Sequence, residues 1–154
     1  MTLYANADPS FTVAYPSTWS YQRNLPAETT GGVLMVFRAP PEGVVDGYQD
    51  NIVVWDHEWP HPVTGRDVAA KVFAHAHKWI ADYHFLRRSR ATLSGLKGGQ
   101  IEYTGTNEDR PLRLVTVWTG TGSTTYFITY AAEPGSYEHD LRAARVLIES
   151  FRLT

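Results

Sequence analysis

The stretch of sequence that decides the fold covers residues 85–131 and runs FLRRSRATLSGLKGGQIEYTGTNEDRPLRLVTVWTGTGSTTYFITYA. Four segments within it are rich in β-branched, aromatic or alternating apolar residues, which predicts a strand for each: 85–93, 100–104, 112–119 and 125–131. The links between them are short and rich in Gly, Ser, Asn and Asp. Because a parallel pair would need a crossover of about a dozen residues or more, the sequence predicts a four-stranded antiparallel meander.

Further strands are predicted before the meander: 11–15, which ends at Pro16, 33–37, which follows two glycines, and 51–55, which is rich in β-branched residues. Residues 39–49 hold two Pro and two Gly, which indicates a loop. Residues 56–63 carry two more prolines and are predicted to leave the sheet.

The clearest predicted helix covers residues 64–83. Thr64 can cap it, with Asp67 three residues later in the position of a capping box. At about 100° per residue its apolar side chains form one stripe, which predicts packing on a sheet: Val68, Val72, Ala76, Trp79, Ile80 and Tyr83. Trp79 is therefore expected to be buried beneath this helix, and its replacement by Ala to cost about 3–5 kcal/mol.

A second helix is predicted at the end of the chain. Pro134 and Gly135 form a turn, and Ser136 is a candidate N-cap. Its apolar face comprises Tyr137, Leu141, Ala144, Ile148 and Phe151. Two helices with a mostly antiparallel sheet of about six to seven strands make an α+β fold, in a single domain over residues 1–154.

Composition and charge exclude several classes of protein. Hydrophobic residues make up 43% of the 154 and the formal net charge is −2, which excludes intrinsic disorder and a bulk attraction to nucleic acid. Without cysteine there are no disulfides, thiolate metal sites or cysteine nucleophiles. The longest apolar run is far shorter than the roughly 20 residues of a membrane span, so no membrane insertion is predicted. The first residues lack a signal-peptide pattern, so a cytoplasmic location is expected if Met1 is the natural start, and an extracytoplasmic one if a signal peptide has been removed.

Three tempting patterns have simple structural interpretations. The basic cluster Arg87-Arg88-Ser89-Arg90 divides between both faces of a strand and lacks the breadth of a nucleic-acid surface, so no nucleic-acid partner is predicted. His75 and His77 lie about 200° apart around a helix and cannot share a metal ion. Residues 120–125, Gly-Thr-Gly-Ser-Thr-Thr, join two predicted strands, which indicates a hairpin turn instead of a phosphate-binding loop.

The stretch richest in side chains that could bind a ligand or a metal ion is Asp56-His57-Glu58-Trp59-Pro60-His61-Pro62. Its candidate binding residues are His57, Glu58, Trp59 and His61. Imidazole and carboxylate groups suit a divalent metal, but no HExxH helix is present and no metal site is predicted. Trp59 is interpreted as an anchor for a partner, since Trp is enriched at binding hot spots. The alternative is that Trp59 folds back and seals the end of the sheet.

Several short motifs, taken in order, resemble those of the PsbP-like family. Residues 11–19, FTVAYPSTW, are similar to the family's strand that ends in a Tyr-Pro-x-x-Trp turn, and residues 51–54, NIVV, to its Asn-Val strand. Residues 98–104, GGQIEYT, resemble its glycine-containing turn into a Tyr-bearing strand. Residues 150–153, SFRL, resemble its closing Ser-Phe segment. The resemblance spans nearly the whole chain.

The resemblance implies a central antiparallel sheet sandwiched between helices and a role in binding. Members of the family bind photosystem II, the small GTPase Ran or secreted toxins. No catalytic residues or cofactors are carried over, and the sequence has no Gly-x-Ser-x-Gly elbow, so the protein is not expected to be an enzyme. The predicted function is that of a non-catalytic accessory protein that docks to another protein. The alternative is a small-ligand or divalent-metal-binding protein that uses the loop at residues 56–61.

The two functional predictions differ in the surface that each requires. An exposed apolar patch favours docking to a protein. A concave apolar pocket with a few convergent polar groups favours a small ligand.

Overall fold

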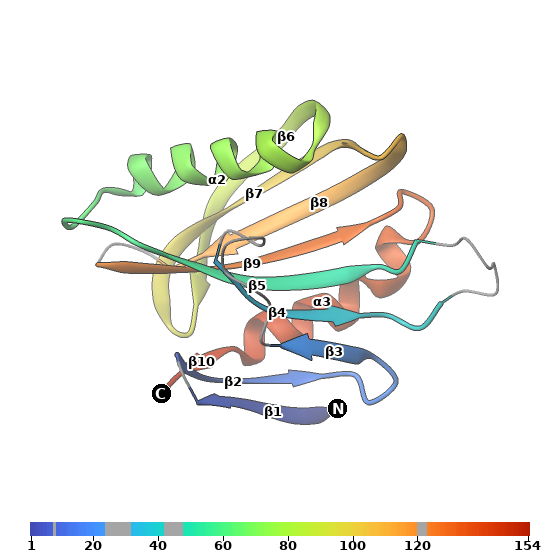
Figure 1. Ribbon diagram of the computed structural model, residues 1–154, viewed down its shortest axis with the longest axis horizontal. Helices are drawn as coiled ribbons and strands as arrows, with labels where there is room; N and C mark the ends of the chain where they lie inside the picture. The colour runs from blue at the N-terminus through green and yellow to red at the C-terminus, as the bar shows by residue number, and fades with distance from the viewer. Residues whose placement is uncertain (8, 24–31, 42–47, 120–122) are drawn as a thin grey trace.

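The computed structural model describes residues 1–7, 9–23, 32–41, 48–119 and 123–154 (Figure 1). Its strands form two antiparallel sheets. The larger sheet has the order β3 (Ser20–Arg23), β4 (Val33–Arg38), β5 (Asn51–Glu58), β9 (Thr124–Ala132), β8 (Arg110–Trp118), β7 (Leu96–Asn107) and β6 (Ala81–Leu93). The smaller sheet has the order β1 (Thr2–Ala7), β2 (Ser10–Tyr15) and β10 (Arg152–Leu153). The helices α2 (Gly65–Trp79) and α3 (Tyr137–Ser150) complete the fold.

The predicted meander is confirmed, because β6, β7, β8 and β9 are successive antiparallel neighbours. The link between β6 and β7 is shorter than predicted: Ser94 and Gly95 alone form the turn, with φ of 56° and 73°. β7 therefore begins at Leu96, so Gly98 and Gly99 lie within a strand and not in a turn. The predicted turn at 120–125 lies partly outside the described residues, as does the predicted loop at 39–49.

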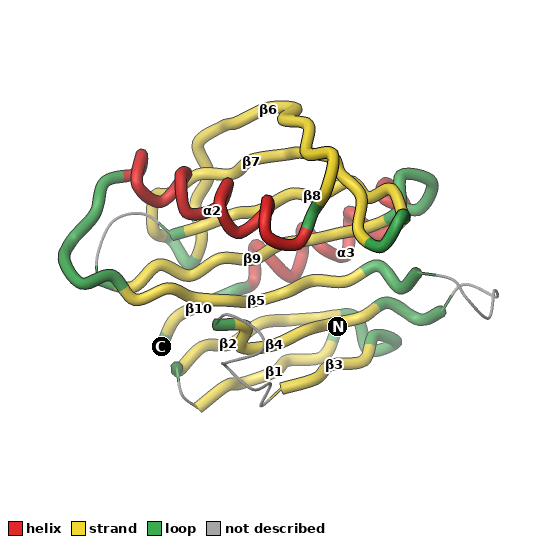
Figure 2. Tube along the Cα trace, turned by 45° about the horizontal axis from the view of Figure 1, so that its top comes forward, coloured by secondary structure: helices red, strands yellow, loops and turns green. Residues whose placement is uncertain are grey.

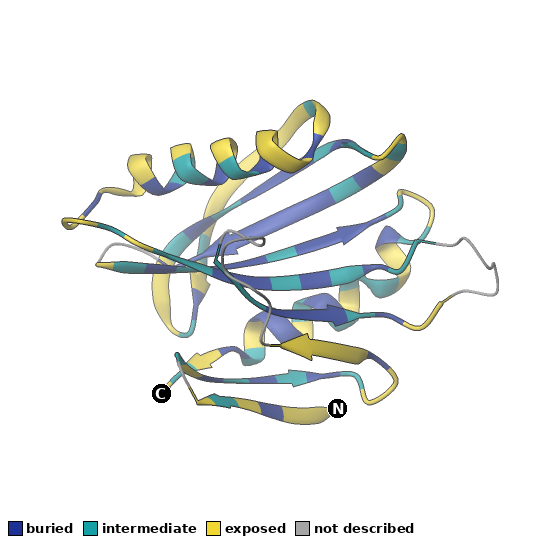
Figure 3. Ribbon diagram, viewed as in Figure 1, coloured by how far each residue is buried: buried dark blue, intermediate teal, exposed yellow. Residues whose placement is uncertain are grey.

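The seven-stranded sheet is covered on both faces (Figure 2). Helix α2 packs on one face, over a core that includes Trp55, Trp118 and Phe127. Helix α3 and the three-stranded sheet share the other face, over a core that includes Phe37 and Ile128. Figure 3 shows the buried residues of the sheet between these layers. The predicted α+β class is confirmed, but the sandwich between helices holds only in part, since β1, β2 and β10 cover much of the second face.

Helix α2 begins as its sequence predicts. Thr64 Oγ1 accepts a hydrogen bond from the Asp67 backbone N–H at 3.4 Å, and Asp67 Oδ2 accepts one from the Thr64 N–H at 3.1 Å. This reciprocal capping box satisfies two backbone donors that have no partner within the helix. The helix ends at Trp79, four residues before the predicted end, because Ile80 adopts extended backbone angles and the chain enters β6.

The expectation that Trp79 is buried is wrong. Val68, Val72 and Ala76 are buried under α2 as predicted, whereas the Trp79 side chain is 46% exposed. The apolar stripe reaches Trp79, but in the last turn it faces an open cavity instead of packed side chains. Ile80, at 8% exposure, closes that end of the core.

Helix α3 presents a buried face that includes Tyr137, Ala144 and Ile148, as predicted. Ser136 stands at the N-cap position, but its side chain makes no capping bond to the helix. Its hydroxyl instead donates to Asp50 Oδ1 at 3.0 Å, which ties the start of α3 to the residue before β5. In the described part of the chain, no helix has the length and apolar character needed to cross a membrane.

Candidate functional site

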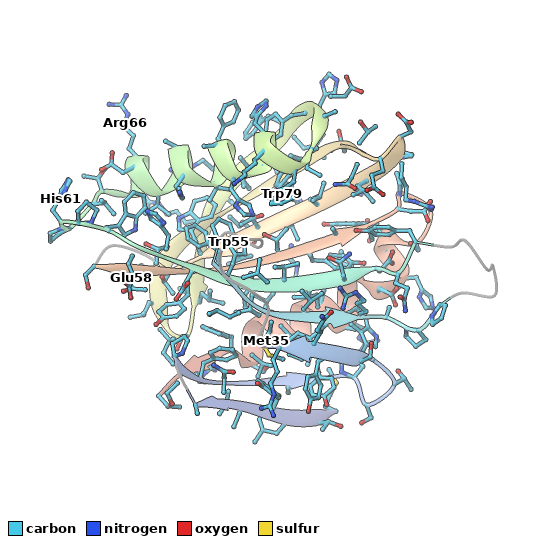
Figure 4. All side chains as sticks on the ribbon, in the orientation of Figure 1. Met35, Trp55, Glu58, His61, Arg66 and Trp79 are labelled. Carbon is cyan, nitrogen blue, oxygen red and sulfur yellow. The ribbon has the colours of Figure 1, made fainter. Side chains whose placement is uncertain are left out.

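The residues predicted to form a binding loop lie partly in a strand. β5 extends through Glu58, because His57 and Glu58 pair with Thr125 and Thr124 of β9. The prediction that the chain leaves the sheet at Asp56 is therefore wrong by three residues. Side chains alternate along a strand, so His57 and Glu58 point to opposite faces. Figure 4 shows Glu58 on β5 and His61 beyond the end of that strand.

Trp59 is half-buried and tied to the sheet. Its indole N–H donates to Thr125 Oγ1 at 2.9 Å, and its backbone N–H donates to the Ser123 carbonyl at 2.7 Å. Its ring packs against the core under α2 and meets the His57 ring edge-on, with centroids 4.6 Å apart. These contacts favour the interpretation of Trp59 as a seal for the end of the sheet over that of an anchor.

The described residues contain no group of three or more His, Cys, Asp or Glu side chains able to hold a metal ion. Within the predicted loop, the rings of His57 and Trp59 are in contact. Two other features of the described residues are candidates for a functional site: a cavity and an exposed surface.

A cavity of about 410 Å³ lies between the C-terminal half of α2 and the sheet, and we call it the α2 cavity. Its walls come from one helix and five strands, and no local pattern in the sequence predicted it. The helix contributes His75, Ala76 and Trp79, and Ile80 follows directly after it. The sheet contributes an apolar floor of Val53, Trp55, Tyr103, Leu112, Leu114 and Ala131.

One group of polar residues of the α2 cavity lies where β4 meets β5. Arg38 and Asn51 are cross-strand partners there, and the Asn51 side-chain amide donates to the Tyr48 hydroxyl at 2.6 Å. Among the described residues that line the cavity, Arg38 is the one with a formal charge at neutral pH. Burial, with smaller contributions from Lys71 and Lys78, lowers the pKa of His75 to about 4 and keeps its ring neutral.

A second candidate lies on the outer flank of α2, where aromatic residues of the helix meet β6. Phe73 and Phe85 are 49% and 55% exposed. The Phe73 ring contacts His77 and Tyr83, with centroids 4.2 and 5.2 Å away. Phe85 pairs with Tyr103, a residue of the core under α2, so Phe85 points to the same face of the sheet as the helix.

The aromatic cluster continues into a basic hollow at the start of α2. Arg88, Arg90 and Lys97 line this hollow together with Gly65 and Trp118. None of the three cations forms an ion pair with a described residue. We call the whole set the α2–β6 surface: Phe73, His77, Tyr83, Phe85, Arg88, Arg90 and Lys97.

All residues of the α2–β6 surface except Lys97 lie in a segment of opposite charge to the rest of the chain. Residues 65–93 carry six Lys or Arg and two Asp or Glu, a formal net charge of +4, against −2 for the whole chain. Arg87 does not contribute to this surface, because it points to the other face and binds the buried carboxylate of Glu102. The aromatic and basic groups thus form one stripe with a defined sign of charge.

Comparison with known proteins identifies the class of fold but no sequence relative. No protein-family model matches the chain, and no curated protein matches it either. Solved structures do match: the chain has the PsbP-like fold, as its motifs suggested. The likeness covers 99% of this chain and 92% of CyanoP, the cyanobacterial PsbP of Synechocystis sp. PCC 6803, with a TM-score of 0.68 and 16% sequence identity.

Two further structures show the same architecture. LpqN of Mycobacterium tuberculosis, a protein involved in cell envelope biogenesis, gives a TM-score of 0.70 and 13% identity, with 99% of this chain and 90% of LpqN covered. PA94 of Pseudomonas aeruginosa, a protein of unknown function, gives a TM-score of 0.61 and 18% identity, with 94% and 91% covered. At these identities the likeness establishes the fold alone, so function has to be argued from the surface and the cavity.

Proposed function

We propose that the protein is a non-catalytic accessory module that docks to another protein through the α2–β6 surface. The observation that carries the proposal is the exposure of Phe73 and Phe85 beside cations that form no ion pair with any residue the structure describes. Exposed aromatic side chains in one cluster are typical of protein-binding surfaces. The resemblance to the PsbP-like family, whose members act by binding, supports the same class of function.

The charge of the surface defines the chemistry of the partner. A complementary partner combines apolar side chains, which cover the aromatic rings, with carboxylates, which pair with Arg88, Arg90 and Lys97. Aromatic and Arg residues dominate the energetics of protein interfaces. Phe73 and Arg88 are therefore expected to contribute more to binding than the residues around them.

A rival explanation is that the arginines only protect an exposed strand edge. β6 is the last strand of the seven-stranded sheet, and charged residues on such strands prevent pairing between copies of a protein. On that explanation, reversing the charges leaves the binding of other proteins unchanged, because Glu protects a strand edge as Arg does. On our proposal, reversal abolishes the binding of the partner.

Site-specific photo-crosslinking in the native host separates these explanations. A benzophenone amino acid replaces Phe73, or Val146 on the opposite face as the control, since Val146 of α3 is also exposed. We expect a discrete protein adduct at position 73 and none at 146. The adduct should disappear in R88E/R90E and persist in R142E, a matched reversal on the exposed side of α3.

Three results would overturn the proposal. Equal adducts at positions 73 and 146 would mean that the surface is not selective. An adduct that survives R88E/R90E would remove the arginines from the interface. An adduct that nuclease digests would assign the surface to nucleic acid instead of protein.

A further inference from the structure

We propose that the α2 cavity binds a small amphipathic molecule with an aliphatic body and one carboxylate. The site is separate from the α2–β6 surface: no residue of that surface lines the cavity, and the proposal does not depend on docking. It also replaces the loop at residues 56–61 as the place where a small ligand binds.

The size and walls of the cavity determine the body of the ligand. Its volume of about 410 Å³ falls in the range of roughly 300–1,000 Å³ that is common for small-molecule sites. Much of the floor is formed by aliphatic side chains, including Val53, Leu112 and Leu114. A ligand that displaces water from these groups gains from the burial of apolar area on both sides.

The Trp55 ring of the floor is not free to stack on a planar ligand. One face of the Trp55 indole is covered by His75, with ring centroids 4.0 Å apart and planes within 15°. Phe127 stacks on the same indole at 3.8 Å and 7°. With both rings stacked on it, Trp55 offers no flat face to an aromatic ligand, and the aliphatic part of the floor remains for the body of the ligand.

The polar end of the cavity selects the head group. Arg38 Nη1 donates to Gln22 Oε1 at 3.1 Å, and the guanidinium has further N–H groups that can hold a carboxylate. The Tyr48 hydroxyl accepts from Asn51, so its own proton can be donated to the same carboxylate. Arg38 is the lone formal charge among the described lining residues, so an anionic head is matched and a cationic head is repelled.

A matched set of probes tests both parts of the proposal. Decanoate, decanol and decyltrimethylammonium share one chain and differ in the charge of the head. We expect decanoate to shift the methyl NMR signals of Leu112, Leu114 and Ala131, with weaker effects from decanol and none from the cation. R38Q should weaken decanoate binding about tenfold and leave decanol unchanged, whereas R142Q should leave both unchanged.

A second variant tests the cavity itself. Ala76 lines the cavity from the helix, where Leu is well tolerated, so A76L fills the space and should abolish the methyl shifts. Equal affinity for decanoate and decanol, or unchanged decanoate binding in R38Q, would overturn the carboxylate assignment. Shifts away from the cavity methyls, or no shifts at all, would overturn the site. Because these results come from the isolated protein, they are distinguishable from a failure of the crosslinking experiment.

Discussion

The imidazole of His75 stacks on the indole of Trp55, with ring centroids 4.0 Å apart and planes 15° from parallel. This contact joins α2 to β5 and forms part of the wall of the α2 cavity. Trp55 is also fixed by its N–H, which donates to Thr129 Oγ1 at 3.1 Å. A positive charge on His75 is disfavoured there, mainly because the ring is partly removed from water, and the pKa falls to about 4.

The first prediction concerns acid sensitivity at His75. The folded-state pKa lies below the ordinary value of 6.5, so the folded protein binds fewer protons than the unfolded chain. The stability that depends on neutral His75 is complete above pH 6.5 and is lost as the pH falls towards 4. His75→Phe, which keeps an aromatic ring, should gain about 2 kcal/mol relative to wild type between pH 8 and pH 4. Urea denaturation across this range measures the gain, and a constant difference would contradict it.

The second prediction concerns Asp50, whose contribution to stability is lost as the pH rises, whereas that of His75 is lost as the pH falls. This carboxyl is 3% exposed, lies beside Asp140 and has its pKa raised to about 7, with burial as the largest cause. The folded protein therefore binds a proton that the unfolded chain releases near pH 4. The corresponding stability is present at low pH and is lost as the pH rises from about 4 to 7.

Asp50→Asn tests this assignment, because the amide resembles the protonated acid and does not ionise. It can still accept from the Ser136 hydroxyl and can donate to Asp140. We expect the variant to be more stable than wild type at pH 8 and close to wild type at pH 4, by urea denaturation. Greater instability of the variant at pH 8 would show that Asp50 is held as a carboxylate.

Local signals in the sequence were sufficient for much of the fold. The meander followed from turn residues at short spacing, and the start of α2 followed from Thr64 and Asp67. These features depend on contacts within a few residues along the chain. The length of β5 was missed because His57 and Glu58 are held in the sheet by β9, more than 60 residues away, and nothing local records that pairing.

The sequence analysis did not predict the α2–β6 surface, because β6 contains a β-bulge. In a regular strand Phe85 and Arg88 point to opposite faces, because side chains alternate. The register of β6 against β7 shifts between Phe85 and Arg87, which places Arg88 on the same face as Phe85. The alternation of the residue types therefore gave no sign of one continuous stripe. The α2 cavity could not be predicted from the sequence for another reason: its walls come from six elements that lie apart along the chain.

A third prediction compares Trp59 and Trp79. The sequence analysis interpreted Trp59 as a binding anchor and Trp79 as a buried core residue, but in the structure Trp79 is the more exposed of the two. Trp59→Ala should lower the free energy of unfolding by about 2–3 kcal/mol, because it removes a half-buried ring and the bond to Thr125. Trp79→Ala should cost only about 1 kcal/mol, since that ring is 46% exposed. Thermal and urea denaturation of the two variants measure the difference. A loss below 1 kcal/mol for Trp59→Ala would restore its interpretation as a binding anchor.

The last prediction uses two glycines, one in contact with a neighbouring strand and one in open space. Gly98 lies in β7, where a Cβ atom would come within 2.8 Å of the Trp118 carbonyl carbon and 2.9 Å of the Thr119 carbonyl carbon. These are backbone atoms, which cannot move without separating β7 from β8. Gly98→Ala should therefore destabilise the protein by about 1–3 kcal/mol or more.

Gly65→Ala is the control, because a Cβ there meets nothing within 4 Å and Ala is the better helix former at the first position of α2. We expect Gly65→Ala to leave stability unchanged or to raise it by up to about 1 kcal/mol. Urea denaturation compares the two, and equal stability of both variants would mean that β7 and β8 are not packed as closely as Gly98 and Trp118 indicate.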